Sequence, residues 1–407
     1  MFEAVLGSAV FVGIVLVLVG VVLAARAMLI PSGAITIRVN ERLEITAPRG
    51  ARLLQVLVDG GVAIPASCGG VGTCGQCRVT MTQGTTPALP TDEALLSRQD
   101  IARGVRLACQ TTLRAPLSIK VPEALFSAKT YGCTVISSRT VAPLIREIVL
   151  SLPQDSGFAF TPGGFVMVEA PAYRLSYADY HIAPEHRAAW DRMALNAVKA
   201  GSKTPVARAY SMASAVADGP DRITLLIRLA LPPPDVPEAP PGVVSSWLFG
   251  VKPGDAVPIS GPFGDFAAQD SDREMVFIGG GVGMAPLRAI ISDQLERRGT
   301  KRKMSFWFGA RSLVDLYYGQ EFDQRQARHA NFQWTAALSD PAPDDDWHGE
   351  TGFIHEVALR RYLASHPAPH RCEYYLCGPP MMMRAVQMML DNLGVEPDTI
   401  FHDDFGG

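Results

Sequence analysis

The chain has 407 residues, with 37 basic and 40 acidic side chains and a formal net charge of −3. A prior of about 150 residues per domain predicts two or three domains, and a near-neutral charge gives no electrostatic case for nucleic acid. Hydrophobic residues make up 48% of the chain and charged residues 19%, which is enough apolar material for several cores.

An uncharged apolar run comes first, at residues 4–25. At 1.5 Å per residue a helix of this length reaches about 33 Å, and the hydrocarbon core of a bilayer is ~30 Å thick. A cleaved signal peptide would have a basic start and a shorter apolar stretch. The cations Arg26, Arg38 and Arg42 follow the run, so the positive-inside rule places the N-terminus outside and the rest in the cytoplasm. We expect one transmembrane helix, in an anchor of residues 1–27.

Residues 33–126 predict a small α+β domain of the β-grasp type. The elements are, in order, a hairpin, a helix, a cysteine-rich loop, a strand, a second helix and a returning strand. The second helix is expected to begin with Thr91 as its N-cap, followed by an acidic first turn. The expected strands are Ile35–Val39, Leu43–Ala47, Arg78–Thr82 and Leu117–Val121, and the first helix is Arg52–Val58.

The cysteine loop, residues 68–77, reads C-G-G-V-G-T-C-G-Q-C, and a fourth cysteine follows in L-A-C-Q-T. Plant-type [2Fe–2S] sites use C-x4-C-x2-C with a distant fourth cysteine, and this loop has one extra residue between the first two. Its glycines allow the backbone to wrap a cluster. Zinc is the alternative, but four-cysteine zinc sites usually pair two short knuckles and only one is present. The expected cluster ligands are Cys68, Cys74, Cys77 and Cys109. The three remaining cysteines, an odd number, argue against a disulfide framework.

Residues 127–268 predict a small antiparallel β-barrel, because short β-rich runs alternate with Pro and Gly turns. An insertion at 173–203 is too long for a plain connection and should carry its own helix around His186–Lys199. The expected strands are Cys133–Ser137, Arg146–Leu150, Phe165–Glu169 and Ile223–Leu229.

Two strings in this region favour a flavin. In R-A-Y-S-M, Arg208 can clamp a pyrophosphate, Tyr210 can stack on a flat heterocycle and Ser211 can hydrogen-bond its edge. In G-V-V-S-S-W-L, the turn before a helix can donate to phosphate. The candidate contacts there are Gly242, Val243, Ser245 and Ser246.

Residues 269–407 alternate strand and helix, which predicts an α/β domain with a parallel sheet covered on both faces. The expected strands are Met275–Ile278, Met304–Phe308, Phe332–Ala336 and Tyr374–Leu376, and the expected helices are Pro286–Arg297 and Met381–Leu393.

Three loops of this domain predict a dinucleotide site. The first, G-G-G-V-G-M-A-P at 279–286, follows a strand and opens a helix, where a pyrophosphate can approach the backbone. It lacks the third glycine of G-x-G-x-x-G, so a bare structural turn is the alternative. C-G-P-P at 377–380 and G-A-R at 309–311 occupy similar positions. The candidate contacts are Gly279, Gly280, Gly281, Gly283, Met284, Arg311, Gly378 and Pro379.

The donor is expected to be NADH. The loop after Met304–Phe308 offers a single cation, Arg311, followed by Asp315 rather than a second basic residue. Arg311 could pair with a 2′-phosphate, but it could equally lie along the adenine or bond Asp315. A 2′-phosphate needs cations around it, so this loop attracts NADPH only weakly.

The motifs Arg208-x-Tyr210-Ser211, Gly242-x-x-Ser245, Gly279–Pro286 and Cys377–Pro380, in this order, resemble the ferredoxin–NADP⁺ reductase superfamily. With an anchor and a [2Fe–2S] domain ahead of that module, the whole chain resembles the family of F subunits of the Na⁺-translocating NADH:quinone oxidoreductases. The insertion and the D-D-F-G ending at Asp403–Gly406 add to the resemblance.

The resemblance implies FAD rather than FMN, NADH as electron donor, and a complex in the bacterial inner membrane with several partner subunits. Electrons would pass from NADH to FAD, to [2Fe–2S] and to a membrane partner, and ultimately to a quinone. Other subunits would export Na⁺. Arg208, Tyr210 and Ser211 would hold FAD, and Phe405 would shield the flavin face. Ser211 and Cys377 would lie near the reacting edge of the flavin. The candidate catalytic residues are therefore Ser211, Cys377 and Phe405, and Glu321 is a further candidate for a ribose or nicotinamide contact.

Two other functions remain open. One is the reductase component of a bacterial multicomponent oxygenase, which has the same ferredoxin and flavin modules; the apolar run and the insertion count against it. The other is a membrane-anchored zinc-binding module with a degenerate reductase fold.

Overall fold

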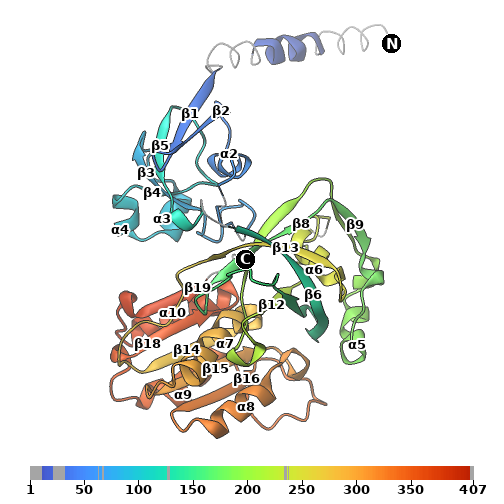
Figure 1. Cartoon of the computed structure of the whole chain (residues 1–407), viewed down its shortest axis with the longest axis vertical. Coiled ribbons are helices and arrows are strands. Elements are labelled where there is room, and N and C mark those ends of the chain that lie inside the picture. The colour runs from blue at the N-terminus through green and yellow to red at the C-terminus, as the bar shows by residue number, and fades with distance from the viewer. Residues whose placement is uncertain are drawn as a thin grey trace. The chain divides into compact units, whose positions relative to one another are not determined.

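The computed structural model describes residues 12–21, 33–62, 64–66, 68–125, 129–232, 236 and 238–403 (Figure 1). The chain divides into two compact units, Met1–Ile64 with Gly70–Pro122 and Pro65–Gly69 with Glu123–Gly407. Residues 12–21 are helical, and the rest of the expected transmembrane run lies outside the described residues. Among the described residues, no helix combines the length and apolar character that crossing a membrane requires.

The first unit is built on a mixed five-stranded sheet, and its strand Val105–Leu107 was not expected from the sequence. Its strand order is β2-β1-β5-β3-β4, with β1 and β5 parallel and the other neighbours antiparallel. One helix, α2, buries Leu53, Val56 and Leu57. The elements are β1 Ala34–Val39, β2 Leu43–Pro48, α2 Leu53–Asp59, β3 Arg78–Gln83, α3 Pro90–Leu95, α4 Arg98–Ala102, β4 Val105–Leu107 and β5 Leu117–Lys120.

The start of α3 differs from the expectation. The N-cap is Leu89 rather than Thr91, because Pro90 has the fixed φ that suits the first helical position. The acidic first turn is present and has a packing role. The buried Asp92 carboxylate accepts from the Leu89 N–H at 2.8 Å and from the Leu107 N–H at 3.0 Å. Asp92 therefore ties α3 to β4.

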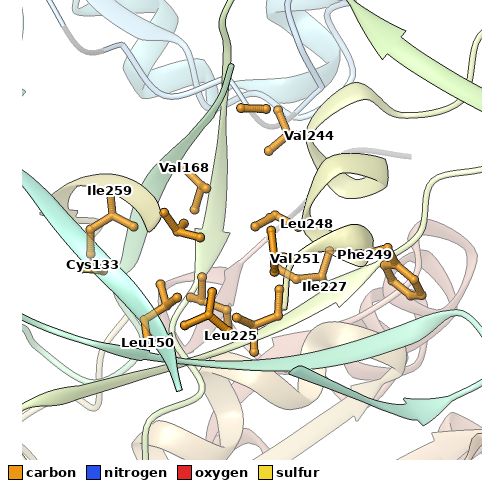
Figure 2. Close-up of a cluster of buried hydrophobic side chains, with 14 of the residues drawn as sticks. Cys133, Leu150, Val168, Leu225, Ile227, Val244, Leu248, Phe249, Val251 and Ile259 are labelled. Carbon is orange, nitrogen blue, oxygen red and sulfur yellow. The ribbon is translucent and has the colours of Figure 1, made fainter. Parts of the chain in front are cut away.

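The second unit contains a closed antiparallel barrel. Its strand order is β11-β8-β13-β6-β7-β12, and the Ala213 N–H donates to the Thr224 carbonyl at 2.7 Å to join the two outer strands. Figure 2 shows side chains of this core, where Val244 and Leu248 of α6 pack with residues of the barrel strands. The strands are β6 Lys129–Ala142, β7 Ile145–Ser151, β8 Phe165–Ala170, β11 Val206–Ser211, β12 Arg222–Arg228 and β13 Ala256–Phe263, and the helix is α6 Val243–Gly250.

The insertion forms an arm with its own strand pair. β9 (Tyr173–Ser176) pairs antiparallel with β10 (Lys199–Ser202), and α5 (Pro184–Arg192) lies between them in sequence. In Figure 1 it is the green segment that carries β9 and α5. The helix is shorter than expected and ends at Arg192, since Ala194 adopts a left-handed φ of 53°.

The last part is a parallel sheet with helices on both faces. The strand order is β17-β16-β15-β14-β18-β19. Helices α7 and α8 pack in one hydrophobic cluster, and α9 and α10 in another. The elements are β14 Met275–Gly280, α7 Met284–Ser292, β15 Met304–Ala310, α8 Gly319–Arg328, β16 Phe332–Leu338, β17 Glu350–Thr351, α9 Ile354–Arg361, β18 Glu373–Cys377, α10 Pro380–Asn392 and β19 Ile400–Asp403.

The helix after the glycine loop begins two residues earlier than expected, at Met284, and continues beyond Ser292 as a short π-helical turn, Asp293–Arg297. The barrel and the sheet share a core, because Ala142, Ile145 and Leu226 of the barrel pack in the α7 cluster.

Candidate functional site

The structure gathers three of the predicted cluster ligands in the first unit. Cys74 lies in the loop, Cys77 directly precedes β3 and Cys109 follows β4, and all three are buried. The Cys109 N–H points at Cys77 Sγ at 3.5 Å, and Gln110 Nε2 lies 3.4 Å from Cys109 Sγ. The hydrogen bond with Cys109 and burial raise the pKa of the Cys77 thiol.

The loop backbone fits a bound metal group. Gly69, Gly70, Gly72 and Gly75 all have positive φ, between 66° and 93°. A Cβ at Gly72 would lie 2.5 Å from Gln110 Nε2, the group beside the Cys109 sulfur. Buried thiols with N–H donors aimed at them match the environment of an iron–sulfur cluster. Cys68 is half-buried and lies in Pro65–Gly69, which groups with the other unit, so its place in the ligand set stays a prediction.

The flavin string lies on strand β11 of the barrel. Arg208, Tyr210 and Ser211 face Val168, Val166 and Phe165 of β8 in the register. Because side chains alternate along a strand, Arg208 and Tyr210 share one face and Ser211 points to the other. Burial raises the pKa of the Tyr210 phenol still further above physiological pH, so the ring is neutral. This face therefore presents one cation and one neutral aromatic ring.

Ser211 meets the end of the parallel sheet. Its hydroxyl is buried and donates to Asp403 Oδ2 at 2.7 Å. Asp403 ends β19 opposite Cys377, and Cys377 ends β18 opposite Gly279 of β14. Ligands of open α/β sheets bind at this carboxyl edge. Two predicted residues, Ser211 and Cys377, therefore both lie next to Asp403 at this edge.

Asp403 was not among the candidates from the sequence. The only signal for it was its place in the D-D-F-G ending. Phe405 lies outside the described residues.

The serine hydroxyls at the start of α6 hydrogen-bond to backbone groups of the protein. Ser245 Oγ and Ser246 Oγ both donate to the Gly242 carbonyl, at 3.2 and 2.6 Å. Ser245 Oγ also accepts from the Ala230 N–H at 3.2 Å. The groups left to meet a phosphate here are therefore backbone N–H groups of Val243 and its neighbours at the helix start.

Tyrosines of the insertion hold α6 in place. The Tyr173 hydroxyl donates to the Val243 carbonyl, and the Tyr180 hydroxyl donates to the Ser246 carbonyl at 2.6 Å. The fully buried Tyr177 shares a hydrogen bond with Ser246 Oγ at 2.7 Å. Sequence reasoning identified the insertion but not this role, since nothing in the pattern pairs these tyrosines with residues about 70 positions later.

The glycines of the dinucleotide loop permit close packing of two strand ends. A Cβ at Gly283 would lie 1.9 Å from the Cys377 carbonyl oxygen, and one at Gly378 would lie 3.1 Å from the Gly280 nitrogen. Gly281 has a φ of 54°, and its carbonyl accepts from the Tyr317 hydroxyl at 2.7 Å. The Met284 side chain is fully buried in the α7 cluster, so only its backbone is available to a ligand. Pro379 caps the start of α10.

Two candidates have protein partners that change their interpretation. Arg311 pairs with Asp340 at 3.1 Å, and both side chains are exposed. Asp315 instead accepts from the Ser312 hydroxyl at 2.9 Å. Glu321 is ion-paired with Arg288 at 2.7 Å and with Arg325, so it does not fit the ribose or nicotinamide contact expected from the sequence.

Glu274, His366 and Cys372 form a further group of potential metal ligands at the opposite end of β14 and β18. The Ala368 N–H donates to His366 Nδ1 at 3.2 Å, which places the imidazole proton on Nε2, facing Glu274. Lys303 also pairs with Glu274, at 3.5 Å. These contacts describe a satisfied hydrogen-bond network rather than a cation site.

Three family models match the chain in succession. They describe a 2Fe-2S iron-sulfur cluster binding domain at residues 37–114, an oxidoreductase FAD-binding domain at 193–267 and an oxidoreductase NAD-binding domain at 277–388. The similarity continues over full-length relatives. The chain is 47% identical over 405 residues to the F subunit of the Na(+)-translocating NADH-quinone reductase of Marinomonas sp. (strain MWYL1), covering 100% of this chain and 99% of the relative. It is 48% identical over 407 residues to the protein of the same name from Yersinia pseudotuberculosis serotype I, covering both chains completely.

Solved structures share the fold. A cytochrome P450 reductase from Amycolatopsis is 26% identical with a TM-score of 0.60, over 91% of this chain and 98% of that one. The ferredoxin reductase in carbazole 1,9a-dioxygenase is 25% identical with a TM-score of 0.57, over 92% and 99% of the two chains.

Proposed function

Because this chain belongs to the family of F subunits of the Na(+)-translocating NADH-quinone reductases, we propose that it is the NADH-oxidising, electron-input component of such an enzyme. The observation that carries the proposal is the full-length similarity together with cluster, FAD and NAD domains in one order. Electrons would enter from NADH at FAD, pass to the [2Fe–2S] cluster, and leave through partner subunits toward a quinone.

The cofactors supply the redox chemistry. A bound flavin accepts electrons in pairs from NADH and releases them singly, as a [2Fe–2S] cluster requires. Cys74, Cys77 and Cys109, with Cys68, would ligate the cluster.

Binding of the two nucleotides would use separate surfaces. Arg208 and the N–H groups at the start of α6 would bind the FAD pyrophosphate, and Tyr210 would lie along its ring system. The Gly279–Gly283 loop and the Gly378 turn would receive NADH at the carboxyl edge of the sheet. The buried Ser211 hydroxyl, held by Asp403, would keep a proton next to the reacting centre.

We also propose the cellular arrangement and the domain bounds. Residues 1–27 would anchor the chain in the bacterial inner membrane by one helix, with the N-terminus outside. The cluster domain would occupy 33–126, the FAD barrel 127–268 and the NADH domain 269–407. The apolar run contains no ionisable residue between Ala4 and Ala25, so Na⁺ would cross through other subunits.

The reductase component of a multicomponent oxygenase is the second candidate. The likeness to the ferredoxin reductase in carbazole 1,9a-dioxygenase favours it, but at 25% identity. The 47–48% identity to F subunits of the quinone reductase, over every part of the chain, supports the first candidate more strongly.

The test is purification of the full chain from membranes with its partners. We expect flavin and iron–sulfur absorption, bleaching of both by NADH, and co-purification of membrane subunits with NADH:quinone activity. A soluble oxygenase as the partner would favour the second candidate. Absence of flavin and iron from freshly isolated protein would overturn both.

A further inference from the structure

Arg288 links the barrel to the parallel sheet from a buried position. It lies on α7, one turn after Met284, and is 6% exposed. Its guanidinium donates to the Ala213 carbonyl at 2.5 Å and to both oxygens of Asp218, at 2.9 and 3.4 Å. It also donates to both oxygens of Glu321 on α8, at 2.7 and 3.0 Å. One side chain therefore holds groups from the barrel and from α8 at once.

Tyr318 extends this link to the dinucleotide loop. The Arg288 guanidinium lies 4.7 Å from the Tyr318 ring centroid, and the Tyr318 hydroxyl donates to Glu147 of barrel strand β7. The adjacent Tyr317 donates to the Gly281 carbonyl at 2.7 Å. Contacts are thus continuous from the barrel through Arg288 and the two tyrosines to the glycine loop.

The energetics favour a geometric role for this network. Buried ion pairs add little net stability compared with apolar packing, because both ions lose their hydration. A planar guanidinium with five donors nevertheless fixes the direction of each carboxylate that it binds, which a hydrophobic contact does not. Arg288 therefore constrains the positions of its partners more than it stabilises the fold.

We propose that Arg288 is a positioning residue for hydride transfer, holding β11 at a fixed distance from the Gly281–Gly283 loop. The inference rests on the proposed function, which assigns β11 to the flavin and the loop to NADH. Ala213 is two residues beyond Ser211, and the loop directly precedes α7. In the transfer NADH loses a hydride and leaves as NAD⁺, and the flavin gains that hydride. Displacement of the reacting atoms by about 1 Å can slow such a step by roughly 100-fold.

The experiment compares Arg288 with a matched buried arginine in the full-length protein. Arg302 lies just before β15, its side chain is 9% exposed, and it pairs with Glu373 at the start of β18, at the other end of the sheet from the glycine loop. The variants are Arg288→Lys, Arg288→Met, Asp218→Asn and Arg302→Met. For each one we would measure FAD content, Tm, KM for NADH, and the single-turnover rate of flavin bleaching per bound FAD.

We expect Arg288→Lys and Asp218→Asn to keep FAD and a KM within about 2-fold of wild type, while the bleaching rate falls at least ~10-fold. Arg302→Met should lower Tm but leave the rate per flavin unchanged. Wild-type rates in both Arg288→Lys and Asp218→Asn, or an equal loss in Arg302→Met, would overturn the inference. These two variants decide the question even if Arg288→Met does not fold. If NADH does not bleach wild-type flavin, the proposed function itself fails.

Discussion

Single atoms decide several positions of the candidate site. A Cβ at Gly283 would meet the Cys377 carbonyl oxygen at 1.9 Å, so the glycine is required there by packing between two strand ends, whatever binds above them. The Ser246 hydroxyl is fully buried between Tyr177 and the Gly242 carbonyl and has no capacity to spare for a phosphate. The sequence motifs predict ligand contacts for Gly283 and Ser246, whereas the contacts in the structure show that each residue has a structural role.

Replacing Cys109 by Ala should abolish the electron paramagnetic resonance signal of a reduced [2Fe–2S] cluster while flavin binding persists, because Cys109 and the residues assigned to the flavin lie in separate units. Cys133→Ala is the control. Burial in the barrel raises the pKa of the Cys133 thiol to about 11, so it stays protonated and unsuited to metal. A normal signal in Cys109→Ala would remove Cys109 from the ligand set.

Arg208→Ala should weaken FAD binding by about 1.5–3 kcal/mol, the range for a hydrogen bond to a charged group. Flavin content after gel filtration and titration of the apoprotein measure this loss. Arg174→Ala, on strand β9 of the insertion, should retain the wild-type flavin content. Equal affinity in Arg208→Ala and wild type would remove the pyrophosphate assignment.

At the scale of elements, the positions of helices α6, α7 and α8 depend on contacts with segments that are distant in the sequence. The insertion supplies tyrosine hydroxyls to α6, and a network of Asp218, Arg288, Glu321 and Arg325 joins the barrel to α7 and α8. Neither contact is encoded by a local pattern. Both lie beside the surfaces assigned to the flavin and the dinucleotide.

Tyr177→Phe should lower the free energy of unfolding by about 0.5–1.5 kcal/mol, the usual net value of one hydrogen bond, and should also weaken FAD binding. The reason is that Ser246 loses a partner at the first turn of α6. Denaturant unfolding and FAD titration give the two values. Tyr131→Phe is the matched control, since Tyr131 is also buried in the barrel and no hydrogen bond of its hydroxyl occurs among the described residues. Equal flavin affinity in both variants would contradict the role assigned to the insertion.

The ion network should make stability depend on acid pH. Burial alone would raise the pKa of Asp218 and of Glu321, but hydrogen bonds and charge attraction from Arg288 outweigh it and hold both pKa values below the ordinary 3.8 and 4.5. The unfolded chain therefore binds more protons than the folded chain as pH falls through this range. The contribution is complete above about pH 5 and is lost progressively below pH 4.5.

Thermal unfolding between pH 6 and pH 3.5 should show a smaller drop in Tm for Asp218→Asn than for wild type. Asp340→Asn, which removes an exposed carboxylate of the same unit, should follow the wild-type slope. If Tm falls equally steeply with pH in wild type and in Asp218→Asn, the network does not cause the loss of stability at acid pH.

At the scale of the whole molecule, two assemblies of secondary structure meet at one edge. The barrel strand β11 and the ends of β18 and β19 come together through Ser211, Asp403 and Cys377. The separate first unit gathers Cys74, Cys77 and Cys109. The matches to a cluster domain and to an FAD-binding domain in different parts of the chain fit the proposed electron-input role, in which a flavin takes electrons in pairs and a cluster takes them singly.

The choice between NADH and NADPH depends on how the segments after β15 and β16 come together. Asp340, on the segment after β16, neutralises Arg311 after β15 and leaves the pair with no net charge to attract a 2′-phosphate. We expect kcat/KM to be higher for NADH than for NADPH with ferricyanide as acceptor. Asp340→Asn should lower the NADH-to-NADPH ratio by freeing Arg311. A wild-type ratio below one would reverse the choice of donor.

The sequence alone determined the classes of the domains and their order. Apolar periodicity, glycine and proline turns, and the spacing of four cysteines are local signals, and they indicated the β-grasp sheet, the barrel, the parallel sheet and the chemistry of the strings at 68–77, 208–212 and 279–286. Boundaries were less well determined. Pro90 and Met284 moved two helix starts, and a left-handed Ala194 ended α5 early, because capping and φ depend on local geometry that periodicity does not report.

Only the tertiary structure decided which side chains meet. Asp403 reached Ser211 across 192 positions, Asp340 rather than Asp315 paired with Arg311, and Glu321 was bound by two arginines. Such pairings depend on the register of the strands and the packing of the helices. Sequence spacing predicts contacts only between residues within one element or turn, so it could not predict these. The sequence therefore specified the chemistry available to this protein, and the fold determined which groups are left to perform it.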